Sequence, residues 1–169
     1  MKLRTALTSC VLVLGATMAS TAMAQTPPAG GGGGGGGGPQ KSPAERAIEY
    51  RQALYTLVGG NFTPIGNILQ GRGEYNAADV TKRAERVAFL ATMAPDAFPE
   101  VSKDGKTKAK PEIWTDKAGF AKAMKEFGDS SAALAALVKT DHTNSAAFKA
   151  AAGKVGEACK GCHDNFRAK

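Results

Sequence analysis

Apolar residues recur every three or four positions through most of the chain from residue 43 onward, which is the spacing of one helix face. Ser42-Pro43-Ala44-Glu45 has the pattern of a capping box with proline at the first helical position. The pattern predicts a long helix that ends near Gly71, with a kink or weak turn at Gly59, Gly60 and Pro64. Its expected inward face holds Ile48, Arg51, Tyr55, Val58, Phe62, Ile65 and Leu69.

Three further helices follow from the same periodicity. Asn76 is suited to cap the second, which Pro95 stops, and a long crossover loop from Pro95 to Pro111 leads to the third. We expect the third from about Thr115 to Thr140 and the last from about Ser145 to Arg167. In the second helix the expected inward residues are Val80, Ala84, Val87, Leu90, Ala91 and Ala94. In the third helix they are Phe120, Met124, Phe127, Leu134 and Val138. In the last helix they are Phe148, Ala152, Val155, Cys159, Cys162 and Phe166. With no strand pattern, this predicts an all-α, antiparallel four-helix bundle.

The start of the chain has the layout of a cleavable secretory signal peptide. Lys2 and Arg4 precede an apolar run from Ala6 to Met18, and Ala22-Met23-Ala24 fits a cleavage site. The apolar core is too short to span a membrane. Cys10 also sits in a lipoprotein-like box, but that box comes too early in the apolar run. We therefore expect an exported protein.

Composition divides the remainder into two parts. Residues 25–41 are rich in Gly and Pro, with nine consecutive glycines from Gly30 to Gly38, and we expect them to be disordered. With residues 1–24 as signal peptide, the folded domain is residues 42–169. The net charge is +7. That is mildly basic, so charge alone does not suggest nucleic-acid binding, and no second apolar stretch is long enough for a membrane span.

The motif that carries chemistry is Cys159-Lys160-Gly161-Cys162-His163. Its spacing is that of covalent haem attachment: cysteines at i and i+3 project from neighbouring positions on one helix face, and the histidine is directed at the iron. A disulfide is the usual alternative for a cysteine pair in an exported protein. A zinc site would need two further ligands, for which only His142 remains as a soft donor. We therefore expect one covalently attached haem c in the bundle core, near the C-terminus.

With this motif at its C-terminus, the sequence resembles the cytochrome c′ family from Pro43 to Lys169. The matching segments are Tyr50-Arg51-Gln52, Pro111-Glu112-Ile113-Trp114, and Val155-Gly156 through Cys162-His163 to Arg167. The resemblance implies a periplasmic four-helix bundle, often a homodimer, whose five-coordinate haem binds nitric oxide (NO) and carbon monoxide (CO). It implies electron transfer or NO binding as the role, with an unknown redox partner.

The sixth iron position decides between two versions of this function. Between Pro43 and Leu69 the first helix has no Met, Lys or His, and we expect Met93 and Met124 to be core residues. This favours an open position and ligand binding. The alternative is a low-spin, six-coordinate electron-transfer cytochrome of the same fold. A catalytic enzyme is not expected, because no acid–base pair accompanies Tyr55.

Arg51 places a charge within an apolar stripe, which requires a partner for that charge. Haem propionates suit its planar guanidinium, and the resemblance gives the same role to Gln52. The alternative for Arg51 is a surface ion pair within the helix, with Glu45 or Glu49.

The remaining site residues follow from the resemblance. It implies that Tyr55 covers the distal iron face and that Val58 and Phe98 complete an apolar distal wall. Arg167 matches the arginine that flanks the proximal ligand His163; the alternative is a solvated cation at the helix end.

Overall fold

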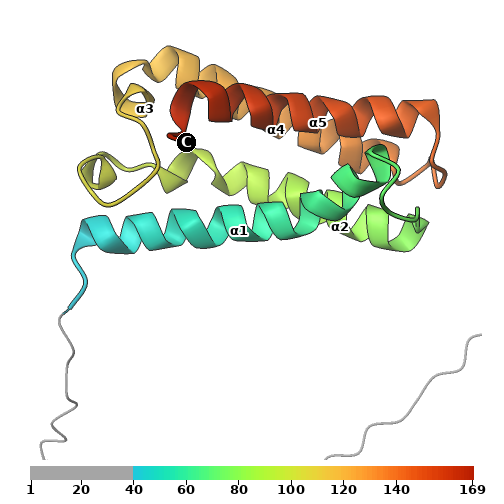
Figure 1. The fold of residues 1–169 in the computed structure, drawn as a ribbon, viewed down its shortest axis with the longest axis horizontal. Helices are drawn as coiled ribbons and strands as arrows, with labels where there is room; N and C mark the ends of the chain where they lie inside the picture. Colours follow the sequence, from blue (N-terminus) through green and yellow to red (C-terminus); the bar gives the residue numbers. More distant parts are fainter. Residues whose placement is uncertain (1–39) are drawn as a thin grey trace, which may run out of the picture. The chain divides into compact units, whose positions relative to one another are not determined.

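The computed structural model describes residues 40–169, and within them the chain is helical. The four long helices are α1 (Pro43–Leu69), α2 (Ala77–Met93), α4 (Lys117–Leu137) and α5 (Ala146–Phe166). Helix α1 packs against α2 and α5, and α4 packs against the same two helices, so the four enclose one core (Figure 1). The all-α four-helix bundle is thus confirmed. The expected signal peptide, and the Gly/Pro-rich segment up to residue 39, lie outside the described residues.

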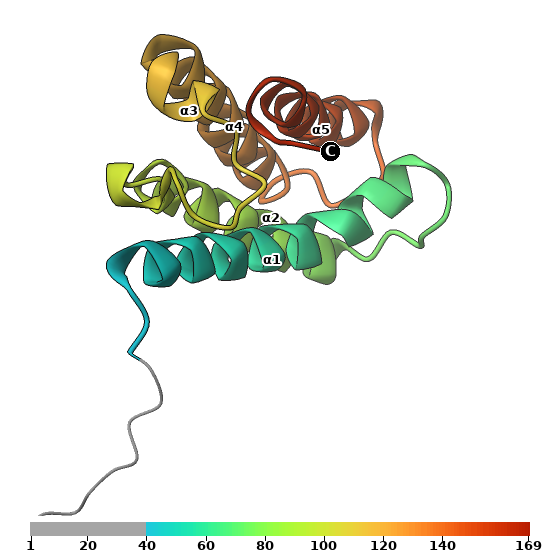
Figure 2. The ribbon, with the colours of Figure 1, turned by 60° about the vertical axis from the view of Figure 1, so that its left-hand side comes forward.

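Helix α1 begins at the predicted capping box. The Ser42 hydroxyl accepts from the Glu45 backbone N–H at 3.2 Å, and the Glu45 carboxylate accepts from the Ser42 N–H at 2.7 Å. The helix continues without a break through Pro64. Figure 2 shows its last turns bending away from the line of the first, as expected for an internal proline. Gly71, with φ at +68°, then turns the chain out of the helix.

The predicted inward face of α1 was partly wrong. Leu54 and Ile68 are buried although they were not expected to be, whereas Tyr55, Phe62 and Leu69 are only half-buried. One stripe cannot describe this helix, because α1 faces α2 on one side and α5 on the other. Tyr55 and Phe62 belong to the side that lines a cavity.

Helix α2 follows the sequence pattern closely. The Asn76 side chain accepts from the Asp79 N–H at 3.0 Å and so caps the helix. All six residues predicted to face inward are buried: Val80, Ala84, Val87, Leu90, Ala91 and Ala94. The helix ends at Met93, and Pro95 begins a 3₁₀ turn, Pro95–Ala97.

The predicted third helix, from about Thr115 to Thr140, corresponds to α4 (Lys117–Leu137), and a short helix that was not predicted precedes it. The short α3 (Glu112–Thr115) is separated from α4 by Asp116, whose φ of −105° and ψ of 67° are not helical. The Asp116 carboxylate accepts from the Gly119 N–H at 3.0 Å and so starts α4 anew. The sequence pattern did not predict α3, which buries Ile113 between the crossover and the predicted start of the third helix. The crossover before α3 is likewise not plain loop, since it contains a second 3₁₀ turn, Glu100–Ser102.

Helix α5 carries the cysteine motif on its inner face. The Ser145 hydroxyl accepts from the Phe148 N–H at 2.9 Å and caps the helix. Beyond α5, the chain pairs with the crossover: the Lys110 N–H donates to the Phe166 carbonyl at 3.0 Å, and the Ala168 N–H donates to the Lys108 carbonyl at 2.8 Å. The crossover is thereby fastened beside the motif. None of the helices in residues 40–169 is long and apolar enough to cross a membrane.

Candidate functional site

A cavity of about 580 Å³ lies among α1, the crossover, α3, α4 and α5. Its volume is in the range of pockets that hold a small molecule or cofactor. The cavity brings together every residue predicted for the site: Arg51, Gln52, Tyr55, Val58, Phe98, Cys159, Cys162, His163 and Arg167. These residues come from three separate parts of the chain, so the tertiary fold unites them.

The two cysteines face the cavity from one side of α5. Both are free thiols and half-buried. Burial raises the pKa of both, that of Cys162 to about 11, with a further contribution there from Cys159. The two thiols are three residues apart on one helix face and line the same cavity, so both can reach one edge of a flat cofactor.

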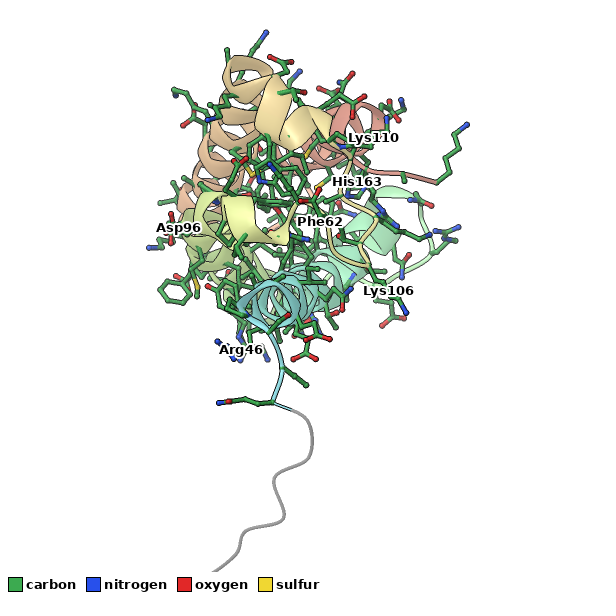
Figure 3. All side chains as sticks on the ribbon, turned by 90° about the vertical axis from the view of Figure 1, so that its left-hand side faces the viewer. Arg46, Phe62, Asp96, Lys106, Lys110 and His163 are labelled. Atoms are coloured by element: carbon green, nitrogen blue, oxygen red, sulfur yellow. The ribbon has the colours of Figure 1, made fainter. Side chains whose placement is uncertain are left out.

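His163 lies one turn beyond Cys159, at the end of the bundle. Figure 3 looks onto this end and labels His163 together with Phe62, which lines the same cavity. Partial burial lowers the pKa of His163, and the nearby charge of Arg167 lowers it further. The Arg167 Nη1 and His163 Nδ1 atoms are 3.5 Å apart. Both effects favour the neutral imidazole, which is the form that binds a metal.

Arg51 is buried, with only 5% of its surface exposed, and it holds the crossover to α1. Its Nη1 donates to the Ala97 carbonyl at 3.1 Å and to the Ser102 hydroxyl at 3.0 Å, and its Nη2 donates to Thr107 Oγ1 at 2.9 Å. The guanidinium also lies 4.8 Å from the centre of the Phe98 ring. A guanidinium has five N–H donors, so two remain for a carboxylate in the cavity.

The alternative for Arg51, an ion pair within its own helix, is wrong. Glu45 is engaged with Ser42 in the capping box, and Glu49 pairs with Lys41 at 2.6 Å. All the hydrogen bonds that Arg51 donates go to the crossover. Gln52, the next residue, lines the cavity with an exposed side chain.

Tyr55 meets a residue that the sequence analysis had assigned only to the core. Its hydroxyl donates to Met124 Sδ at 3.7 Å, and burial raises the pKa of the phenol. Met124 is 6% exposed, as a core residue should be, yet its side chain also lines the cavity. Helical spacing had predicted that Met124 faces inward, but the sequence offered no signal that a cavity lay there.

Aromatic rings form much of the remaining wall. Tyr55, Phe98, Phe120 and Phe166 make successive edge-to-face contacts, with ring centres 6.0, 4.9 and 5.4 Å apart. Phe120 and Phe166 were predicted to face inward but not to belong to the site. The chain of rings joins α1 to α5 through the crossover and α4, and it keeps this part of the cavity apolar.

The zinc alternative finds no further ligands in the described part of the chain. His142, its one candidate donor, is exposed in the turn before α5. Within residues 40–169, no three His, Cys, Asp or Glu side chains gather where they could hold a metal ion.

Comparison with known proteins agrees with this geometry. The sequence model of cytochrome c′ matches residues 46–167. The chain belongs to the cytochrome c′ family. Cytochrome c′ of Rubrivivax gelatinosus is 39% identical over 124 residues, which cover 73% of this chain and 95% of that protein. The cavity, the cysteine pair and the histidine fit the haem c that membership of the cytochrome c′ family implies.

Solved structures of cytochrome c′ also share the fold. Cytochrome c′ of Shewanella frigidimarina is 37% identical, with a TM-score of 0.71, and covers 77% of this chain and 100% of its own. Variants of the Alcaligenes xylosoxidans cytochrome c′ have been solved with bound NO and with bound CO. These two structures are 31% and 32% identical to this chain, each with a TM-score of 0.67, and cover 77% of it and 99% and 100% of their own chains.

Proposed function

We propose that this protein is a monohaem c-type cytochrome whose iron is five-coordinate, binds NO and CO, and transfers electrons, without acting as an enzyme. Cys159 and Cys162 hold the haem covalently, and His163 is the axial ligand. When bound, the haem supplies the iron that takes the gas or the electron. The NO-bound and CO-bound structures of Alcaligenes xylosoxidans cytochrome c′ variants support the choice of ligands.

One observation supports the proposal that the sixth iron position is open. The α1 wall of the cavity contains Tyr55, Val58 and Phe62 but no His, Met or Lys. Tyr55 is a poor iron ligand, because burial raises its pKa and keeps the phenol protonated. The α1 wall therefore leaves space on this side of the cavity and supplies no strong donor to an iron there.

The other residues orient the cofactor and shape its pocket. Arg51 directs its two remaining N–H donors, with Gln52 beside it, toward the propionates. Tyr55, Val58 and Phe98 form the distal wall. Arg167 acts on the proximal side, where its charge adds to the effect of burial in lowering the pKa of His163.

Met124 favours a second candidate, the low-spin electron-transfer cytochrome. Its thioether lines the same cavity, and methionine sulfur is an axial ligand in other cytochromes. In the structure this sulfur accepts the hydrogen bond from Tyr55, so ligation would require that bond to break.

Optical spectra of the ferric and ferrous protein, with and without CO, distinguish the two candidates. The first predicts a high-spin ferrous spectrum that changes on adding CO, in wild type and in Met124→Leu alike. A sharp low-spin ferrous band that CO does not alter would refute it. If that band became CO-sensitive in Met124→Leu, Met124 would be the sixth ligand.

Attachment of the haem has its own test. Cys159→Ser combined with Cys162→Ser should abolish covalent haem, measured as the mass of the denatured protein. His163→Ala should alter axial ligation and leave the thioether bonds possible. Covalent haem that persists in the double cysteine variant would refute the attachment site.

We also propose a periplasmic location and a homodimer, in keeping with the signal-peptide pattern and with the cytochrome c′ family. Tyr50 and Leu57 share one face of α1 and are 44% and 55% exposed, and Phe89 on the neighbouring α2 is 67% exposed. Large exposed apolar side chains on adjacent helices suit contact with a second copy. Light scattering should give twice the monomer mass for wild type and the monomer mass for Leu57→Asp with Phe89→Asp; a monomeric wild type would refute the dimer.

A further inference from the structure

A cluster of cations borders the cavity on the side of the crossover and the C-terminal tail. This basic rim consists of Lys106, Lys108, Lys110, Arg167 and Lys169. Lys108 and Arg167 line the cavity itself. None of the five forms an ion pair with any other residue in 40–169. The rim therefore presents positive charge that no carboxylate of the described residues pairs with directly, although Lys110 also lies near enough to Asp164 to lower its pKa.

The fold fixes this rim in place. Ala109 and Arg167 form an isolated antiparallel bridge, with the backbone bonds described above on either side of it. The Lys110 ammonium donates to the carbonyls of Asp164 and Asn165 at 3.0 and 3.3 Å, at the C-terminal end of α5. Figure 3 shows Lys106 and Lys110 at the same end of the molecule as His163. Two segments far apart in sequence thus hold their charges together.

Nearby carboxylates leave most of this charge unopposed. Asp164 is already paired with Lys160, and Glu100 with Lys103, while the crossover also carries Asp96 and Asp104. The acidic residues Glu112, Asp116 and Glu126 gather instead, together with Lys122, in a groove bordered by Gly161 and Asn165 on α5. Positive and negative charge are therefore separated at this end of the bundle, which favours one orientation of a charged partner.

We propose that the basic rim is the docking surface for an acidic redox protein. The proposal rests on the electron-transfer part of the proposed function. One electron leaves the ferrous protein and reduces the partner by one electron, and no proton or atom is transferred. Complementary charge raises the rate of encounter and is sensitive to salt. Redox encounters of this kind need only a small interface, below about 1,200 Å².

The rate test uses oxidation of the ferrous holoprotein by hexacyanoferrate(III), an anion, over a range of ionic strengths. The rim variant is Lys106→Glu with Lys169→Glu. The control is Arg86→Glu with Lys149→Glu, which changes the net charge equally at exposed positions; Lys149 lies 14 residues before His163 on α5, about 21 Å along the helix. We expect the rim variant to react about ten-fold more slowly at low ionic strength and the control within two-fold of wild type. Equal losses in both variants would mean that only net charge matters, and would overturn the proposal.

Two further measurements do not depend on electron transfer. Redox-inert hexacyanocobaltate(III) should shift the amide NMR signals of residues 106–110 and 167–169 in wild type and not in the rim variant. If the only shifts occurred at other residues, the basic rim would not be the docking surface. Vesicles of equal parts phosphatidylserine and phosphatidylcholine test whether the rim binds an anionic lipid surface instead. Tight binding to these vesicles that the rim variant loses would overturn the proposal that the partner is an acidic protein. If CO fails to alter the spectrum, the proposal of an open sixth iron position is refuted. The NMR and vesicle measurements still decide whether the basic rim is a docking surface.

Discussion

Replacing Arg51 by methionine should release the crossover from α1. Methionine keeps an apolar side chain of similar length against Phe98 but removes the three hydrogen bonds to the crossover. Since these bonds bridge more than forty residues of sequence, their loss acts on the tertiary position of the crossover and leaves the helical propensity of α1 nearly unchanged.

The magnitude follows from the partners that Arg51 leaves behind. The Ser102 hydroxyl still donates to the Pro99 carbonyl at 2.7 Å, and Thr107 Oγ1 still accepts from the Ala109 N–H at 3.1 Å. Of the three acceptors, only the Ala97 carbonyl is left without another side-chain or backbone partner in the described residues. A hydrogen bond to a charged group contributes about 1.5–3 kcal/mol, and an unsatisfied buried acceptor costs about 1–3 kcal/mol. Removing a buried charge offsets part of this loss, so we expect the free energy of unfolding to fall by about 2–4 kcal/mol.

The assay is urea unfolding of the holoprotein together with amide hydrogen exchange of residues 97–107. Loss of about 2 kcal/mol in the crossover should speed its exchange by about 30-fold. Arg51→Lys keeps the charge and should lose less. Arg46→Met is the control, because Arg46 is exposed on the same helix and bonds only to the nearby Lys41 carbonyl. Unchanged exchange in the crossover of Arg51→Met would refute the reasoning.

Three further predictions concern the distal wall, the turn before α5 and the core. Tyr55→Leu should change the affinity for CO, because the side chain lines the cavity beside Met124; an unchanged affinity and rate would remove Tyr55 from the distal wall. Hydrogen bonds from Ser145, then Thr143, hold the pKa of Asp141 below its usual range. The stability this gives is complete above the unfolded pKa, about 3.9, and is lost as pH falls through the lower folded value. Asp141→Asn should therefore flatten the acid side of a plot of urea midpoint against pH, and a slope equal to that of wild type would contradict the assignment. Ile65→Val, at a fully buried position, should cost about 0.5–1.5 kcal/mol, whereas Val101→Ala at an exposed position should stay within about 0.5 kcal/mol; equal urea midpoints for the two variants would contradict the placement of Ile65 in the core.

The helix starts could be read from the sequence because each depends on local chemistry. Ser42, Asn76 and Ser145 all accept a hydrogen bond from an N–H three residues ahead, and such bonds need no distant partner. Asp116 does the same for α4, one residue from the predicted start near Thr115, although it was not named as the cap. The short α3 before it (Glu112–Thr115) was not predicted from the sequence.

The division of α1 into two buried sides was beyond the sequence for a different reason. Leu54 and Ile68 are buried, while Tyr55 and Phe62 line the cavity. All four are apolar or aromatic and occur at helical spacing. Which neighbour each one meets depends on how the other helices pack around α1, and no local pattern encodes that.

By itself, the sequence determined the helical pattern, the haem-attachment motif, and the presence of a charge at position 51 that needed a partner, since these depend on residue type and spacing. Only the tertiary structure decided that Arg51 fastens the crossover, that Met124 meets Tyr55 across the cavity, and that Lys106 to Lys110 lie beside the C-terminal tail. Each of these is a contact between segments more than forty residues apart. Such contacts form when the helices bury their apolar faces together, so they are properties of the packed core and of no single segment.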